Sequence, residues 1–153
     1  MRGINLRTEI KPLTEIADIE RVQKNKIYPM KTIYVQVSAC KKNSEYIWYM
    51  LNDSSILEDK YAVIVPKIDI IPEYLVVVLE RVTLRWMHKY VGSSINISMD
   101  LFKYLEVEFH ISKEMQKFVL SILEPISEEI KLIEERIEKE QAAKKIFCKK
   151  MMP

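Results

Sequence analysis

Residues 112–150 read SKEMQKFVLSILEPISEEIKLIEERIEKEQAAKKIFCKK, and this stretch decides the fold. It holds no glycine and one proline, Pro125. Apolar residues recur at intervals of three and four, which places them along one side of an α-helix. We call this side the apolar seam, and its members are Met115, Val119, Ile122, Ile126, Ile130, Ile133 and Ile137.

At ~1.5 Å per residue the stretch predicts a helix of roughly 58 Å, which is longer than the domain formed by the preceding residues is wide. A stripe of this length indicates a helix partner and a coiled-coil homodimer, although folding back onto the chain's own domain is the competing interpretation. The step of four from Ile126 to Ile130 is a stutter in the heptad. Because Pro125 beside it lacks a backbone donor, we expect the helix to bend or split there. Ser112 is suited to cap the helix start.

The residues before the helix predict an α+β fold. A helical turn running into a strand is expected at residues 13–19, a loop at 24–31, and strands at 32–37, 46–51 and 61–65. A packing helix begins near Pro72 and ends before Gly92, a short helix follows at 98–103, and a last strand at 105–109. The prediction is a small twisted, mostly antiparallel β-sheet domain with a packing helix (residues 1–111), followed by a long C-terminal coiled-coil-type helix (residues 112–153).

Composition argues against an enzyme. The chain has 153 residues, a formal charge of +2 and two glycines, so a glycine-rich phosphate loop is excluded. His88 and His110 have no carboxylate or cysteine at ligand spacing, and Cys40 and Cys148 form no CxxC pair. We therefore expect no catalytic residues, no metal and no cofactor. The short apolar runs and the absence of a secretion signal predict a cytoplasmic protein that binds no membrane.

The order of several segments resembles the specificity (S) subunit of type I restriction-modification systems. The resemblance covers most of the chain, from about Leu13 to Met151, and its segments are Leu13-Thr-Glu-Ile-Ala-Asp-Ile19, Ile71-Pro-Glu-Tyr-Leu75, Gly92-Ser-Ser, Leu101-Phe-Lys-Tyr-Leu-Glu-Val-Glu-Phe109 and Ser112-Lys-Glu-Met-Gln116. In that family a target-recognition domain ends in a strand that leads directly into a long spacer helix. The resemblance implies a half-length form with one target-recognition domain and one spacer helix.

The resemblance further implies a DNA-recognition subunit without catalysis of its own. Such a subunit would bind double-stranded DNA as a homodimer and direct methyltransferase subunits, with restriction subunits as further partners. Basic residues would neutralise phosphates, and serine and asparagine side chains in a tight turn would donate to phosphates or base edges. The candidate DNA-binding residues are Lys24, Lys26, Lys41, Lys42, Lys67, Arg85, Lys89, Tyr90, Ser93, Ser94 and Asn96. For any single lysine the competing interpretation is a solvated surface charge.

A second hypothesis is a protein-interaction module that mimics a specificity subunit and modulates a host restriction-modification complex. The region before Pro72 is shorter than is usual in the family, and the glycines that flank DNA-facing loops there are mostly missing. The near-neutral charge also favours this alternative.

Overall fold

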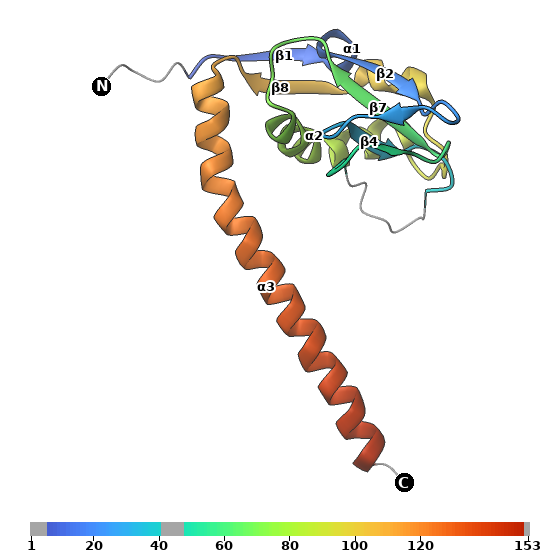
Figure 1. Ribbon diagram of the computed structural model, residues 1–153, viewed down its shortest axis with the longest axis vertical. Helices are drawn as coiled ribbons and strands as arrows, with labels where there is room; N and C mark the ends of the chain where they lie inside the picture. The colour runs from blue at the N-terminus through green and yellow to red at the C-terminus, as the bar shows by residue number, and fades with distance from the viewer. Residues whose placement is uncertain (1–5, 41–47, 152–153) are drawn as a thin grey trace. The chain divides into compact units, whose positions relative to one another are not determined.

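The computed structural model describes residues 6–40 and 48–151 (Figure 1). The chain divides into two compact units, Met1–Lys117 and Phe118–Pro153. The predicted α+β fold is confirmed, with antiparallel sheets, a packing helix and a long C-terminal helix. Lys41 and Lys42 lie outside the described residues, as do the first two residues of the strand expected at 46–51.

A four-stranded antiparallel sheet forms the centre of the first unit. Its strands, in spatial order, are β2 (Ala17–Arg21), β7 (Tyr61–Pro66), β4 (Ile33–Gln36) and β5 (Tyr49–Met50). Strand β7 is continuously apolar because it pairs on both sides, with Ile64 opposite Ile19 of β2 and Ile33 of β4. The strand predicted at residues 61–65 is therefore confirmed, and it lies inside the sheet.

Two short antiparallel pairs complete the strands. Strand β1 (Thr8–Pro12) pairs with β8 (Glu106–His110), and β3 (Ile27–Tyr28) pairs with β6 (Ser55–Ile56). The turn α1 (Leu13–Ile16) leads into β2 as predicted. The loop expected at residues 24–31 is a partial error, since β3 lies within it.

Helix α2 (Pro72–Trp86) supplies much of the core and continues into a π-helical turn, η1 (Met87–Val91). Its buried side chains include Tyr74, Leu75 and Leu79. The indole of Trp86 stacks on Phe102 of η2 (Met99–Tyr104), with ring centroids 5.3 Å apart, and donates to the Leu101 carbonyl. Trp86 is thus a core residue and is not available to stack on a nucleic-acid base.

Helix α3 (Lys113–Met151) runs unbroken for 39 residues with Pro125 inside it. The predicted split is therefore wrong, because the proline removes a single hydrogen bond from a long helix with strong helix formers on both sides. The Ser112 cap is confirmed, since its hydroxyl accepts from the Met115 amide at 3.3 Å. Across the described part of the chain, none of the helices combines the length and apolar character needed to cross a membrane.

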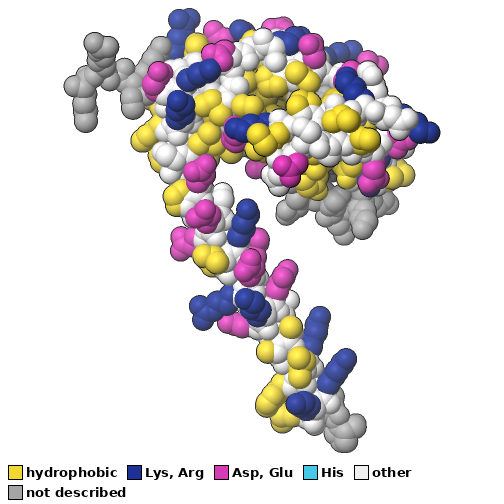
Figure 2. Space-filling model, in the orientation of Figure 1, with side chains coloured by type: hydrophobic (Ala, Val, Ile, Leu, Met, Phe, Trp, Pro, Cys, Tyr) yellow, Lys and Arg dark blue, Asp and Glu magenta, His cyan; other side chains and the backbone are white. Residues whose placement is uncertain are grey.

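The second unit exposes the five isoleucines of the apolar seam. Within the single chain, Ile122, Ile126, Ile130, Ile133 and Ile137 are each 48–51% exposed. Along α3, hydrophobic side chains lie among charged side chains of both signs, and hydrophobic side chains also lie toward the helix end (Figure 2).

Candidate nucleic-acid interface

Two of the predicted DNA-binding lysines already have acidic partners. Lys26 Nζ lies 2.6 Å from the Glu20 carboxylate. Lys67 Nζ lies 3.4 Å from the Asp18 carboxylate and donates to the Thr14 carbonyl at 2.7 Å. A phosphate would have to displace these partners, so both lysines are weak candidates. The remaining predicted lysine before β3, Lys24, is exposed in the turn that follows β2.

The segment from Arg85 to Asn96 keeps its charges free. Arg85 and Lys89 are exposed, and neither forms an ion pair with any residue in the described ranges 6–40 and 48–151. Lys89 Nζ lies 5.0 Å from the centroid of the Tyr90 ring. The structure thus brings the predicted residues Arg85, Lys89 and Tyr90 together at the end of α2 and in η1.

The turn after η1 depends on Gly92. Its φ of +61° lies in the left-handed region, which favours glycine, although a Cβ there would meet nothing within 4 Å. Ser93 follows as an exposed residue. The Ser94 hydroxyl donates to the Asn96 carbonyl at 2.7 Å and accepts from the Asn96 amide at 3.2 Å. The Ser94 side chain therefore shapes the turn.

Asn96 joins this turn to the segment that follows β4. Its Oδ1 accepts from the Ala39 amide at 3.0 Å, and the Cys40 amide donates to the Ile95 carbonyl at 2.8 Å. Ala39 has a φ of +53°, a strained conformation that these contacts stabilise. These contacts join the segment that follows β4 to the turn after η1.

Sequence reasoning missed Lys103 and Tyr104. The Tyr104 ring stacks on Tyr90, with centroids 5.0 Å apart and planes 8° from parallel. Lys103 Nζ lies 4.9 Å from the Tyr104 centroid. The sequence signal was weak, because the dipeptide Lys-Tyr occurs at 60–61 as well as at 89–90 and 103–104.

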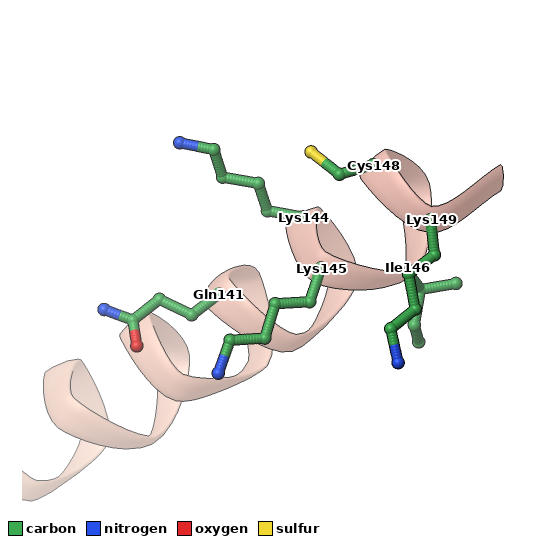
Figure 3. Close-up of a pocket in the computed structure, with 6 residues that line it drawn as sticks. All are labelled: Gln141, Lys144, Lys145, Ile146, Cys148 and Lys149. Carbon is green, nitrogen blue, oxygen red and sulfur yellow. The ribbon is translucent and has the colours of Figure 1, made fainter. Parts of the chain in front are cut away.

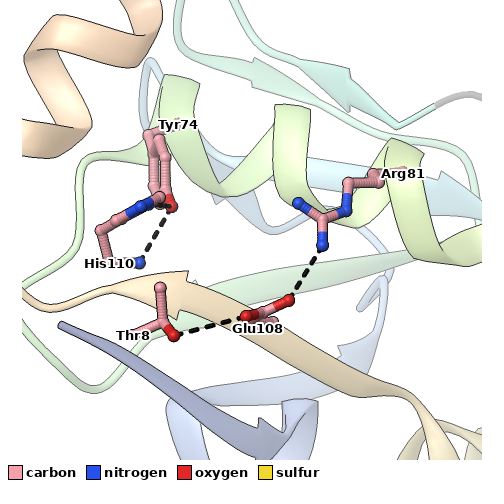
Figure 4. A network of polar contacts seen from close by, with 5 residues as sticks. All are labelled: Thr8, Tyr74, Arg81, Glu108 and His110. Atoms are coloured by element: carbon pink, nitrogen blue, oxygen red, sulfur yellow. Dashed lines mark hydrogen bonds and ion pairs between the residues drawn. The ribbon is translucent and has the colours of Figure 1, made fainter. Parts of the chain in front are cut away.

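A polar network joins α2 to the strand pair β1 and β8 (Figure 4). The Tyr74 hydroxyl lies 2.8 Å from His110 Nδ1 and accepts from the His110 amide at 2.9 Å. Burial raises the pKa of Tyr74, so this hydroxyl stays protonated at neutral pH. Arg81 donates to the Glu108 carboxylate at 2.9 Å, and Thr8 donates to the same carboxylate at 3.3 Å. These contacts join α2 to the strand pair.

The first turn of α3 is joined to the same region by a buried side chain. Gln116 is 1% exposed. Its Oε1 accepts from the Ile71 amide at 2.9 Å, and its Nε2 donates to the His110 carbonyl at 2.7 Å. Because Ile71 is the N-cap of α2, this glutamine connects the starts of two helices.

Three features bear on binding of a metal or a small molecule: clusters of metal ligands, the Cys40 thiol and a surface depression. Among residues 6–40 and 48–151, no three His, Cys, Asp or Glu side chains lie close enough to hold a metal ion. Burial raises the pKa of the Cys40 thiol, which lowers its thiolate fraction at neutral pH. A depression of about 480 Å³ lies along the end of α3 and is lined by Gln141, Lys144, Lys145, Ile146, Cys148 and Lys149 (Figure 3).

No protein-family model and no curated protein matches the sequence. Solved structures do match. The S subunit of a Type-I restriction-modification system from M. genitalium aligns with a TM-score of 0.58 and 13% identity, covering 84% of this chain and 41% of that one. The HsdS subunit from Thermoanaerobacter tengcongensis aligns with a TM-score of 0.59 and 11% identity, covering 84% and 39%.

The chain has the S-subunit fold. The resemblance inferred from the order of sequence segments is thus confirmed at the level of the fold. The chain spans about two fifths of the length of the S subunits it matches.

Proposed function

We propose that this chain is the sequence-specific DNA-recognition subunit of a type I restriction-modification-like complex in the cytoplasm. The S-subunit fold is the observation that carries the proposal. The first unit would read one half of a split DNA site, and α3 would pair with α3 of a second copy. Methyltransferase and restriction subunits would supply the chemistry, and the chain itself would act only by binding.

The exposed seam supports pairing through α3. Half-exposed isoleucines recur over several turns of the second unit, and burying them would stabilise a helix pair by roughly 1 kcal/mol per side chain. The intervals between seam residues are 4, 3, 4, 4, 3 and 4, which is the same order in both directions. In an antiparallel pair centred on Ile126, every seam residue therefore meets a seam residue. Met115 would face Ile137, and Ile122 would face Ile130.

Charge favours the antiparallel arrangement over a parallel one. Residues 124–140 hold seven acids against three basic residues, and residues 141–151 hold four lysines and no acid. A parallel pair would place each of these segments beside its own copy. The antiparallel pair separates the two lysine-rich ends. It also points the two helix dipoles in opposite directions, which is the favourable arrangement.

Cysteine cross-linking distinguishes the two arrangements. In an antiparallel pair the native Cys148 residues would lie roughly 66 Å apart along the axis, so oxidation should give no disulfide. In a Cys148→Ser background, Ile122→Cys alone should also remain unlinked, whereas a mixture of Ile122→Cys and Ile130→Cys chains should cross-link. Efficient cross-linking of Ile122→Cys with itself would establish the parallel arrangement. A monomer in sedimentation would contradict pairing altogether.

DNA binding is tested with the full chain and random-sequence duplex DNA at low and moderate salt. A DNA-recognition subunit must bind at low salt and lose affinity as salt rises, because phosphate contacts release counterions. No binding at low salt would favour the alternative, a specificity-subunit mimic that binds protein partners. The ion pairs that neutralise Lys26 and Lys67 are the observation that keeps this alternative open.

A further inference from the structure

In the described part of the first unit, four lysines hold their ammonium group over a tyrosine ring. They are Lys26, Lys60, Lys89 and Lys103, each with Nζ 4.9–5.2 Å from the ring centroid. A ring restrains the lysine above it and leaves the full charge of its ammonium group in place. Such a lysine is positioned to bind an anion unless an acid already neutralises it.

Acidic partners divide the four lysines into two pairs. Lys26 is bound by Glu20 at 2.6 Å, and Lys60 is bound by Glu58 at 2.8 Å. Lys89 and Lys103 form no ion pair with any other residue that the structure describes. Only the second pair therefore combines a restrained ammonium group with an uncompensated charge.

The two uncompensated lysines lie at one place on the surface. Their rings, Tyr90 from η1 and Tyr104 from η2, stack nearly parallel with centroids 5.0 Å apart. Tyr104 is 45% exposed, and both lysines are exposed. Arg85, one turn before Lys89 along the chain, is a third exposed cation without an ion pair in the described ranges.

We propose that Lys89 and Lys103, held by the stacked Tyr90 and Tyr104 rings, bind phosphates of the DNA backbone. This inference rests on the proposed function and adds Lys103 and Tyr104 to its DNA-facing surface. Phosphate fits because neither ammonium group has an ion-pair partner among the described residues. Two ammonium groups supported by stacked rings also suit a chain of regularly spaced anions. The rings are already stacked on each other, so they support the lysines and do not take up bases.

The salt dependence of DNA binding tests the proposal. Each phosphate contact contributes about 0.9 to the slope of log affinity against log salt. When one contact is lost, the affinity should therefore fall roughly 3.5-fold less than that of the wild type between about 50 and 200 mM salt. Lys89→Gln and Lys103→Gln should each produce this change in the full chain, and the double variant about 12-fold. Fluorescence anisotropy with a labelled random duplex gives the slopes, and tryptophan fluorescence confirms that each variant is folded.

Lys60→Gln is the matched control, because Lys60 has the same ring geometry but is neutralised by Glu58. Its slope should equal that of the wild type. An equal loss in Lys60→Gln would overturn the assignment of the site to the uncompensated pair. Normal wild-type binding with unchanged slopes in both lysine variants would overturn this inference alone. A wild type that does not bind at low salt would overturn the proposed function itself.

Discussion

Substituting Gln116 should destabilise the first unit far more than a change of one helix residue normally does. The Gln116 side chain is 1% exposed, and both ends of its amide are used, by the Ile71 amide and the His110 carbonyl. Leucine has a similar volume but no polar atoms, so Gln116→Leu leaves one donor and one acceptor buried without partners. Each such group costs about 1–3 kcal/mol, so the expected loss is ~2–6 kcal/mol.

Urea unfolding measures this loss directly. Both tryptophans of the chain, Trp48 and Trp86, are buried in the first unit, so their fluorescence reports on that unit alone. A domain of this size has a stability of about 5–15 kcal/mol, so the predicted change is a large fraction of the total. The control is Lys117→Leu at the next, exposed position, where a change within about 0.5 kcal/mol is expected. If Gln116→Leu were as stable as this control, the role of the buried amide would be refuted.

Three further predictions concern the seam, the core and an ion pair. Ile130→Asp should convert a dimer into a monomer in sedimentation, with the dissociation constant raised at least ~100-fold, because a charge would be buried in the seam. Thr83→Val should cost about 1–3 kcal/mol in urea unfolding, since the Thr83 hydroxyl accepts from the buried Trp48 indole at 2.6 Å. Lys31→Gln should lower stability by up to ~1 kcal/mol at neutral pH, because Lys31 lies 2.6 Å from the Glu73 carboxylate.

Each of these has a decisive comparison. Leu132→Asp removes an equally apolar, 66% exposed side chain outside the seam, and should leave the dimer intact. Thr83→Ser retains the hydroxyl and should restore most of the lost stability.

The hydrogen bond from Lys31 holds the pKa of Glu73 below its ordinary value. The loss of stability caused by Lys31→Gln should therefore be complete at pH values above the ordinary pKa of glutamate. It should disappear as the pH falls through the lowered pKa of Glu73. A difference that persists in acid would contradict the ion-pair explanation.

The elements whose signal is local were predictable from the sequence. The apolar run of β7, Pro72 at the start of α2 and the Ser112 cap each act through neighbours along the chain, and all three predictions agree with the structure. The spatial order of the strands was not predictable in this way. It places β7 between β2 and β4, and that choice depends on packing between residues far apart in sequence.

In the candidate site too, local features could be predicted from the sequence and contacts between distant residues could not. The segment from Arg85 to Asn96 was predicted because basic, aromatic and turn residues are adjacent there. The neutralisation of Lys67 by Asp18 could not be foreseen, since the two residues are brought together only by the fold. Gln116 looked like one more polar residue in the first turn of a surface helix, and only the tertiary structure places its amide between two backbone groups.

The pairing of β1 with β8 also determines when the domain can finish folding. Thr8 pairs with His110, so this contact closes a loop of about a hundred residues, and contacts of such long sequence separation form slowly. At a synthesis rate of ~5–20 residues per second, β1 waits roughly 5–20 s on the ribosome for its partner strand. The long helix is translated directly after β8, so it emerges only once the last strand of the domain has been made.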